Sequence, residues 1–146
     1  MQLTTTLLAL IGATASLTAA SAILSERATI PAPCEIQTDP LSDDEAQKRF
    51  KEFTQAFVVK KDVSKGFEFI AANYVNHNPK AATRDAAWAN MSPIWDNMAT
   101  QPLRSKWIAP YAYLQWQADV GLITDRFLWD GGCIVEHWYQ GESWPA

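Results

Sequence analysis

Segments in the second half of the chain alternate apolar and polar residues with a period of two. They follow Gln101 and are rich in aromatic and β-branched side chains: LRSKWIAP, YAYLQWQA, LITDRFLW and CIVEHWYQ. A period of two is typical of β-strands that bury one face. Gly131-Gly132, between the last two segments, favours a tight turn because glycine readily adopts positive φ angles. The sequence therefore predicts about four antiparallel strands in this half.

The half that precedes these segments has helical periodicity instead. A capping box at Ser42 is followed by phenylalanines on one helical stripe, which predicts a helix over 43–59. A second helix is predicted from a cap at Asp62 to the neighbourhood of Asn78-Pro79, because the residue before a proline disfavours helical geometry. Both helices would present an apolar face to the strands.

A third helix is predicted to begin at Thr83, whose hydroxyl can cap it. The segment SPIWDNM after it is either a separate turn or a kinked continuation. Three helices followed by about four strands predict an α+β fold, with the helices packed on one face of the sheet.

The first 22 residues have the features of a secretory signal peptide. They contain no charged side chain, an apolar stretch from Leu7 to Leu17 and small residues suited to cleavage. An uncleaved anchor is the alternative, although the apolar stretch is short for a bilayer. We therefore divide the chain into a signal peptide (1–22), an extended N-terminal arm rich in proline (23–40) and one domain (41–146). We expect a secreted protein with no membrane association after cleavage.

Both cysteines of the sequence, Cys34 and Cys133, lie after the predicted cleavage site. In an oxidising compartment, an even pair favours a disulfide bond. Such a bond would tie the arm to the final hairpin. Two separately buried thiols are the alternative.

The charge of the chain disfavours a nucleic-acid partner. The formal net charge is −4, and Lys and Arg are interspersed with acidic residues. The two histidines are sixty residues apart without a companion cluster of Cys or Asp, so no metal site is expected. No glycine-rich phosphate loop occurs either. A small molecule or another protein chain is the more natural partner.

Two stretches carry a further pattern, YVNHNP at 74–79 and DRFLWDGGCIVEHW at 125–138. The first has the form Tyr-x-x-His-Asn-Pro, and the second is a hairpin that ends in Ile-Val-Glu-His-Trp. Together they resemble the SnoaL-like polyketide cyclase family, within the nuclear transport factor 2-like superfamily. The resemblance extends over about 45–140.

This resemblance implies a cone-shaped fold, in which a curved, mostly antiparallel sheet wraps the helices around an apolar pocket. A homodimer across the outside of the sheet is implied as well. The implied activity is isomerisation, dehydration or cyclisation of an apolar, ring-bearing small molecule in secondary metabolism. This chemistry would use acid/base groups, with no metal and no organic cofactor.

The chain departs from the family pattern in its last strand. The position of the cyclases' proton-transferring aspartate is matched by Tyr139. A phenol is a poor general base at neutral pH. The alternative function is therefore a non-catalytic module that binds a hydrophobic ligand or forms a dimer.

The hairpin register decides whether an acid/base pair exists. If Asp130-Gly131-Gly132 form a three-residue loop, Asp125 lies directly opposite His137. A carboxylate beside an imidazole fixes the tautomer and stabilises the imidazolium. We therefore predict Asp125 and His137 as the catalytic pair. A two-residue loop would instead place Asp125 opposite Glu136 or Trp138, and the pair would not form.

Further side chains are candidates for the pocket: Tyr74, His77, Trp95, Phe127 and Tyr139. Each also has a purely structural explanation. His77 precedes a proline turn and could position the backbone there, and a tyrosine such as Tyr74 is often a core residue. Tryptophans of the domain could line a large cavity or fill the core.

Overall fold

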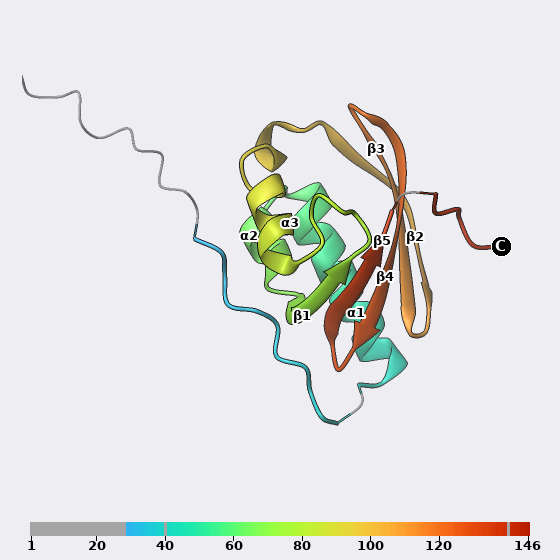
Figure 1. Cartoon of the computed structure of the whole chain (residues 1–146). Helices are drawn as coiled ribbons and strands as arrows, with labels where there is room; N and C mark the ends of the chain where they lie inside the picture. The colour runs from blue at the N-terminus through green and yellow to red at the C-terminus, as the bar shows by residue number, and fades with distance from the viewer. Residues whose placement is uncertain (1–28, 40, 140) are drawn as a thin grey trace, which may run out of the picture.

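The computed structural model describes residues 29–39, 41–139 and 141–146. These residues form three α-helices and five β-strands (Figure 1). The helices are α1 (Asp43–Thr54), α2 (Val63–Phe67) and α3 (Arg84–Met91). The strands are β1 (Ile70–Asn76), β2 (Thr100–Ile108), β3 (Tyr111–Ala118), β4 (Gly121–Asp130) and β5 (Cys133–Trp138). The predicted signal peptide, residues 1–22, lies outside the described residues.

The sheet is mixed, with strand order β1-β5-β4-β3-β2. Strand β1 is parallel to β5, and the other neighbours are antiparallel. The α+β class is confirmed, but the prediction of four strands is wrong. The second helix ends at Phe67, and the segment expected to continue it forms β1. Ile70 and Tyr74, which lie four residues apart, fit a helical stripe and an edge strand equally well.

The helices lie on one face of the curved sheet (Figure 1). All three N-terminal caps form as expected, at Ser42, Asp62 and Thr83. From α1, Phe50 and Phe53 pack on Trp129 of β4 with ring centroids 6.2 and 6.3 Å apart. This aromatic contact between helix and sheet forms the centre of the core. Among the described residues, no helix has the length and apolar character that crossing a membrane requires.

The segment after α3 forms a separate turn, which was one of the two alternatives predicted for it, and not a kinked continuation of the helix. A 3-10 turn at Trp95–Asn97 follows α3, and Trp95 is completely buried. Its indole Nε1–H donates to the Phe57 carbonyl at 2.6 Å, and the two rings stack with centroids 4.2 Å apart. These contacts of Trp95 therefore hold the segment after α3 against the π-helical turn Gln55–Val59, which extends α1.

The β4–β5 hairpin has a register that differs from the predicted one. Its turn comprises two residues, Gly131-Gly132, with φ angles of 47° and 82°. The pairing then shifts by one residue, so that Val135 is the extra residue of a β-bulge. The pairs, from the turn outwards, are Asp130 with Cys133, Trp129 with Ile134, Leu128 with Glu136, Phe127 with His137 and Arg126 with Trp138.

This register corrects two predictions. Asp125 is not directly opposite His137, because Phe127 takes that place. Ile134, which a three-residue loop would place opposite Leu128 on the outer face, is 1% exposed and belongs to the core. Both errors come from the predicted three-residue loop without a bulge.

The predicted disulfide between Cys34 and Cys133 is confirmed, and it joins residues 99 positions apart in the sequence. The arm also forms backbone hydrogen bonds with the domain, from Cys34 N–H to the Ile70 carbonyl and from Gln37 N–H to the Gly131 carbonyl, each 3.0 Å. The buried guanidinium of Arg84 donates to the carbonyls of Pro31 and Ala32 at 2.8 and 3.3 Å. The described part of the arm is therefore anchored along its length.

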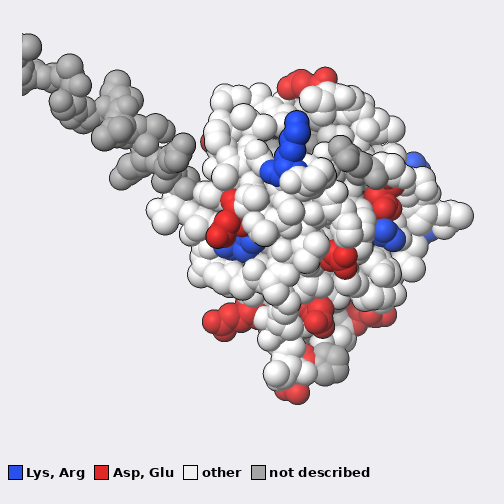
Figure 2. Space-filling view, in the orientation of Figure 1, with Lys and Arg blue, Asp and Glu red and all other residues white. Residues whose placement is uncertain are grey.

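On the face shown in Figure 2, basic side chains lie apart from one another between acidic ones. They do not gather into a stripe on this face. The expectation that nucleic acid is not a partner stays a prediction.

We predict that the double substitution C34A/C133A lowers the free energy of unfolding by roughly 3 to 5 kcal/mol, because the bond closes a very long loop in the unfolded chain. Urea unfolding of the variant and of the oxidised protein measures this difference. Reduction of the wild-type protein is the matched control and should give the same loss. A loss below about 1 kcal/mol would mean that the other arm contacts suffice.

Candidate functional site

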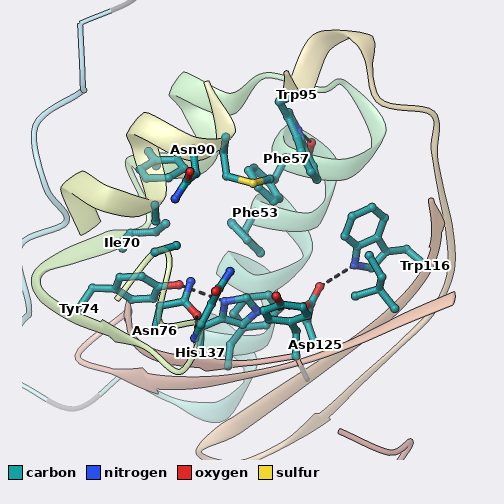
Figure 3. Close-up of a pocket in the computed structure, with 18 of the residues that line it drawn as sticks. Phe53, Phe57, Ile70, Tyr74, Asn76, Asn90, Trp95, Trp116, Asp125 and His137 are labelled. Atoms are coloured by element: carbon teal, nitrogen blue, oxygen red, sulfur yellow. Dashed lines mark hydrogen bonds and ion pairs between the residues drawn. The ribbon is translucent and has the colours of Figure 1, made fainter. Parts of the chain in front are cut away.

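A cavity of about 230 Å³ lies between the helices and the inner face of the sheet (Figure 3). Its walls are mainly aromatic and aliphatic. The lining residues are Phe53, Phe57, Phe67, Ile70, Tyr74, Asn76, Asn78, Ala81, Ala87, Asn90, Met91, Trp95, Met98, Trp116, Val120, Ile123, Asp125, Phe127, His137 and Tyr139. An apolar cavity with a few polar groups is typical of sites for small molecules.

Asp125 is a buried carboxylate in this wall, with an exposed fraction of 6%. Its Oδ2 accepts a hydrogen bond from Nε1–H of Trp116 at 2.5 Å. Its Oδ1 is 2.9 Å from Nε2 of His137. The indole N–H can only donate, so Oδ2 of Asp125 is the acceptor in this contact.

The β-bulge brings His137 to the same face as Asp125. Phe127 pairs with His137 and lies two residues after Asp125 in β4, so Asp125 and His137 are diagonal neighbours. If the pairing that begins at the turn continued without the bulge, His137 would lie opposite Arg126, on the outer face. A shift by one residue reverses the face of every following side chain. The structure thus brings the predicted pair together, by a register that was not predicted.

Tyr74 extends this arrangement from β1. Its hydroxyl is 3.1 Å from Nδ1 of His137. Burial and the nearby charge of Asp125 raise the pKa of the Tyr74 phenol above its ordinary value. Tyr74 therefore remains protonated at physiological pH and can donate to Nδ1, while Nε2–H donates to Asp125. Trp116, Asp125, His137 and Tyr74 form one continuous chain of hydrogen bonds, which we call the polar chain.

Aromatic rings fix the His137 imidazole on its other sides. The ring of Phe127 stacks on it with centroids 4.7 Å apart and an angle of 10°. The ring of Tyr139 lies 6.0 Å away. Of the five predicted pocket residues, Tyr74, Trp95, Phe127 and Tyr139 line the cavity.

His77, the fifth, is not among the lining residues, and the pocket position predicted for it is wrong. Its Nε2 is 2.6 Å from Oε1 of Glu136, and its ring stacks on Trp138 at 4.7 Å. Both partners lie on the outer face of β5. Tyr74 and Asn76 of β1 face the cavity, so alternation along the chain directs His77 to the opposite side.

Sequence reasoning missed the role of Trp116 as the donor to Asp125. Strands β3 and β4 pair without a shift, and Leu114 is directly opposite Asp125. Trp116 is two residues from Leu114 and is therefore a diagonal neighbour of Asp125. Pairing β3 with β4 residue by residue, starting from the tight turn between them, would have predicted the contact between Trp116 and Asp125. Three amides that line the cavity were also missed: Asn76, Asn78 and Asn90.

No family model matches the sequence, and no curated protein matches it. Solved structures do match. TsrD from Streptomyces laurentii has a TM-score of 0.54 at 14% identity, covering 68% of this chain and 90% of that one. A SnoaL-like protein of unknown function from Burkholderia thailandensis has a TM-score of 0.54 at 13% identity, covering 70% and 100%. A candidate polyketide cyclase from Sinorhizobium meliloti has a TM-score of 0.51 at 15% identity, covering 68% and 100%.

The protein therefore shares its fold with SnoaL-like and nuclear transport factor 2-like proteins. In this SnoaL-like fold the cavity lies between the helices and the concave side of the sheet (Figure 3). Across the described residues, no three His, Cys, Asp or Glu side chains are grouped so that they could hold a metal ion.

We predict that Tyr74→Phe flattens the pH dependence of stability in the alkaline range. An unfolded tyrosine loses its proton above about pH 10, whereas folded Tyr74 keeps it because its pKa is raised. The unfolded state thus binds fewer protons, and the free energy of unfolding falls as the pH rises, by up to about 1.4 kcal/mol per pH unit from this group.

Urea unfolding at about pH 9, 10 and 11 measures this slope. Tyr113→Phe, which changes a tyrosine on the outer face of β3, is the matched control. Equal slopes for the wild type and for Tyr74→Phe would show that Tyr74 titrates alike in both states.

Proposed function

We propose that this protein binds an apolar, ring-bearing small molecule in the cavity and transfers protons to or from it through Asp125 and His137. The polar chain in the wall of a mainly apolar cavity carries this proposal. Burying a carboxylate in such surroundings is costly unless it is hydrogen-bonded. Titratable groups of this kind in a cavity are typical of functional sites.

The geometry suits a proton relay. In the neutral state, Nδ1 of His137 accepts the hydroxyl proton of Tyr74. If His137 gains a proton, Nδ1–H donates to Tyr74, whose own O–H then becomes available to a ligand in the cavity. Tyr74 can thus pass a proton to the ligand and recover one from His137, while Asp125 stabilises the imidazolium.

Such a relay supports reactions that need only acids and bases, namely isomerisation, dehydration or cyclisation. A neighbour in fold from Sinorhizobium meliloti is described as a candidate polyketide cyclase. Its description and the polar chain together favour a role in secondary metabolism. The protein itself would supply all the proton-transferring groups.

A non-catalytic module that binds a hydrophobic ligand is the second candidate. Tyr139 favours it, because this residue stands where the cyclases have their proton-transferring aspartate. Its ring lies at the cavity beside His137 and adds apolar surface. This candidate retains the cavity and assigns the polar chain to structure alone.

Secretion and a homodimer are also part of the proposal. Secretion is supported by the signal-like sequence of residues 1–22 and by the Cys34–Cys133 disulfide. For the homodimer, the outer face of the sheet carries aromatic side chains such as Tyr111 and Trp138. The C-terminal segment contacts this face too, since Glu142 pairs with Arg126 at 3.0 Å.

We predict that the protein accelerates ring opening of nitrobenzisoxazole, an apolar bicyclic carbon acid that releases a coloured phenolate when a base removes its ring proton. Asp125→Asn and His137→Ala should each lower the rate about a hundredfold, because general-base catalysis contributes about that much. Absorbance measures the rate, and saturation with substrate separates binding from chemistry.

His77→Ala is the matched control, since it removes the other histidine of the sequence, which lies outside the cavity. Its rate should equal that of the wild type. Saturable binding of nitrobenzisoxazole without acceleration would instead support the non-catalytic candidate. An unchanged rate in His137→Ala would refute the proposed role of that residue.

A further inference from the structure

The cavity discriminates among ring-bearing molecules by size, charge and the position of an oxygen atom. We propose that its ligand is an uncharged compound of one or two rings with a carbonyl oxygen, and that Tyr74 and Asn76 hold this oxygen. This assignment rests on the proposed function and specifies the class of molecule that the site takes.

The volume of the cavity limits the number of rings. At about 230 Å³ it is larger than the engineered apolar cavities of roughly 150 Å³ that bind benzene. It is smaller than the range of about 300 to 1,000 Å³ that is typical of pockets for drug-sized molecules. A ligand of one or two rings is therefore the size that fits, and a linear four-ring system is too large.

The charges of the wall exclude an anion. None of the described residues that line the cavity is Lys or Arg, and Asp125 is the acidic residue among them. His137 is the lining residue that could become a cation, and Asp125 already pairs with it at 2.9 Å. The buried cation Arg84 is committed to backbone carbonyls, including that of Phe67 at 3.1 Å. A carboxylate on the ligand would lose its hydration and lie near Asp125 without a cation to compensate.

Two donors converge at the end of the cavity that holds the polar chain. Asn76 is two residues after Tyr74 on the same face of β1, and it pairs in register with His137 (Figure 3). The Oδ1 of Asn76 accepts from the Asn78 backbone N–H at 3.0 Å, which directs its Nδ2 donors elsewhere. Within the described part of the chain, these Nδ2 donors have no acceptor. A carbonyl oxygen has two lone pairs. It can accept from Asn76 and, once protonated His137 donates to the Tyr74 oxygen, from the Tyr74 hydroxyl as well.

The other amides of the cavity are already engaged in holding its rim. The Oδ1 of Asn78 accepts from the Lys80 N–H at 3.0 Å, and the Nδ2 of Asn90 donates to the Lys80 carbonyl at 2.5 Å. Both side chains thus fix the loop between β1 and α3. The Nδ2 group of Asn78 also has no acceptor among the described residues, but Asn78 lies beyond the end of β1, whereas Asn76 is two residues from Tyr74 on the same face of that strand. Asn76 is therefore the amide whose free donors lie beside Tyr74.

Isothermal titration calorimetry with four probes tests this assignment on the full mature chain. The probes are acetonaphthone, an uncharged two-ring ketone; methylnaphthalene, which lacks the oxygen; naphthoate, which is an anion; and a four-ring ketone. We expect acetonaphthone to bind about tenfold more tightly than each of the other three. One good hydrogen bond to an otherwise unpaired donor corresponds to a factor of about that size.

Asn76→Leu, which keeps the shape of the side chain, should weaken acetonaphthone binding about tenfold and leave methylnaphthalene unchanged. Asn73→Leu, the same change at an exposed position of β1, is the matched control and should alter neither. Tyr74→Phe provides a second variant if Asn76→Leu does not fold, and it should have the same selective effect on the ketone.

Three results would overturn the assignment while leaving the proposed function intact. These are equal affinities for acetonaphthone and methylnaphthalene, naphthoate binding as tight as ketone binding, and tighter binding of the four-ring ketone. If none of the four probes binds, both the assignment and the proposed function are wrong.

Discussion

The β-bulge at Val135 determines which side of the sheet the chemistry of the last strand faces. On the turn side of the bulge, Ile134 enters the core, and beyond it His137 enters the cavity. An unshifted strand would send one of these two side chains to the outer face. A bulge costs ladder hydrogen bonds, but here it lets one strand serve both the core and the site. The polar chain depends on this single extra residue.

The arm and the hairpin stabilise this geometry from outside. A Cβ atom on Gly131 would lie 2.5 Å from the Gln37 carbonyl oxygen, so the arm packs directly on the turn. The disulfide fixes Cys133, the first residue of β5. Because the start of β5 is held by a covalent bond and its turn by the arm, the register that follows is well defined. The position of His137 thus follows from contacts made several residues earlier.

The sequence predicts local features well where one physical signal dominates. Ser42, Asp62 and Thr83 were recognised as caps because a side-chain acceptor before a helix has few other uses. Strand β1 was missed because Ile70 and Tyr74 satisfy both periods, and its parallel partner β5 is about sixty residues away. The bulge at Val135 could not be predicted, since nothing in its own sequence distinguishes it from a regular strand residue. The prediction that Asp125 and His137 share a face was right because two errors compensated each other: the turn is one residue shorter than predicted, and the bulge adds one residue to β5.

The identity of residue 139 determines which side chains of this cavity are candidates for proton transfer. With a phenol in place of the cyclases' aspartate, Asp125 of β4 is the carboxylate that remains among the described lining residues. Its two oxygens accept hydrogen bonds from Trp116 and His137, which hold the carboxylate in place beside the imidazole. In the proposed relay, a proton passes between His137 and the ligand through Tyr74, at the end of the polar chain. In the function that we propose, the carboxylate orients the imidazole and stabilises its protonated form, and Tyr74 of β1 is the group that contacts the ligand.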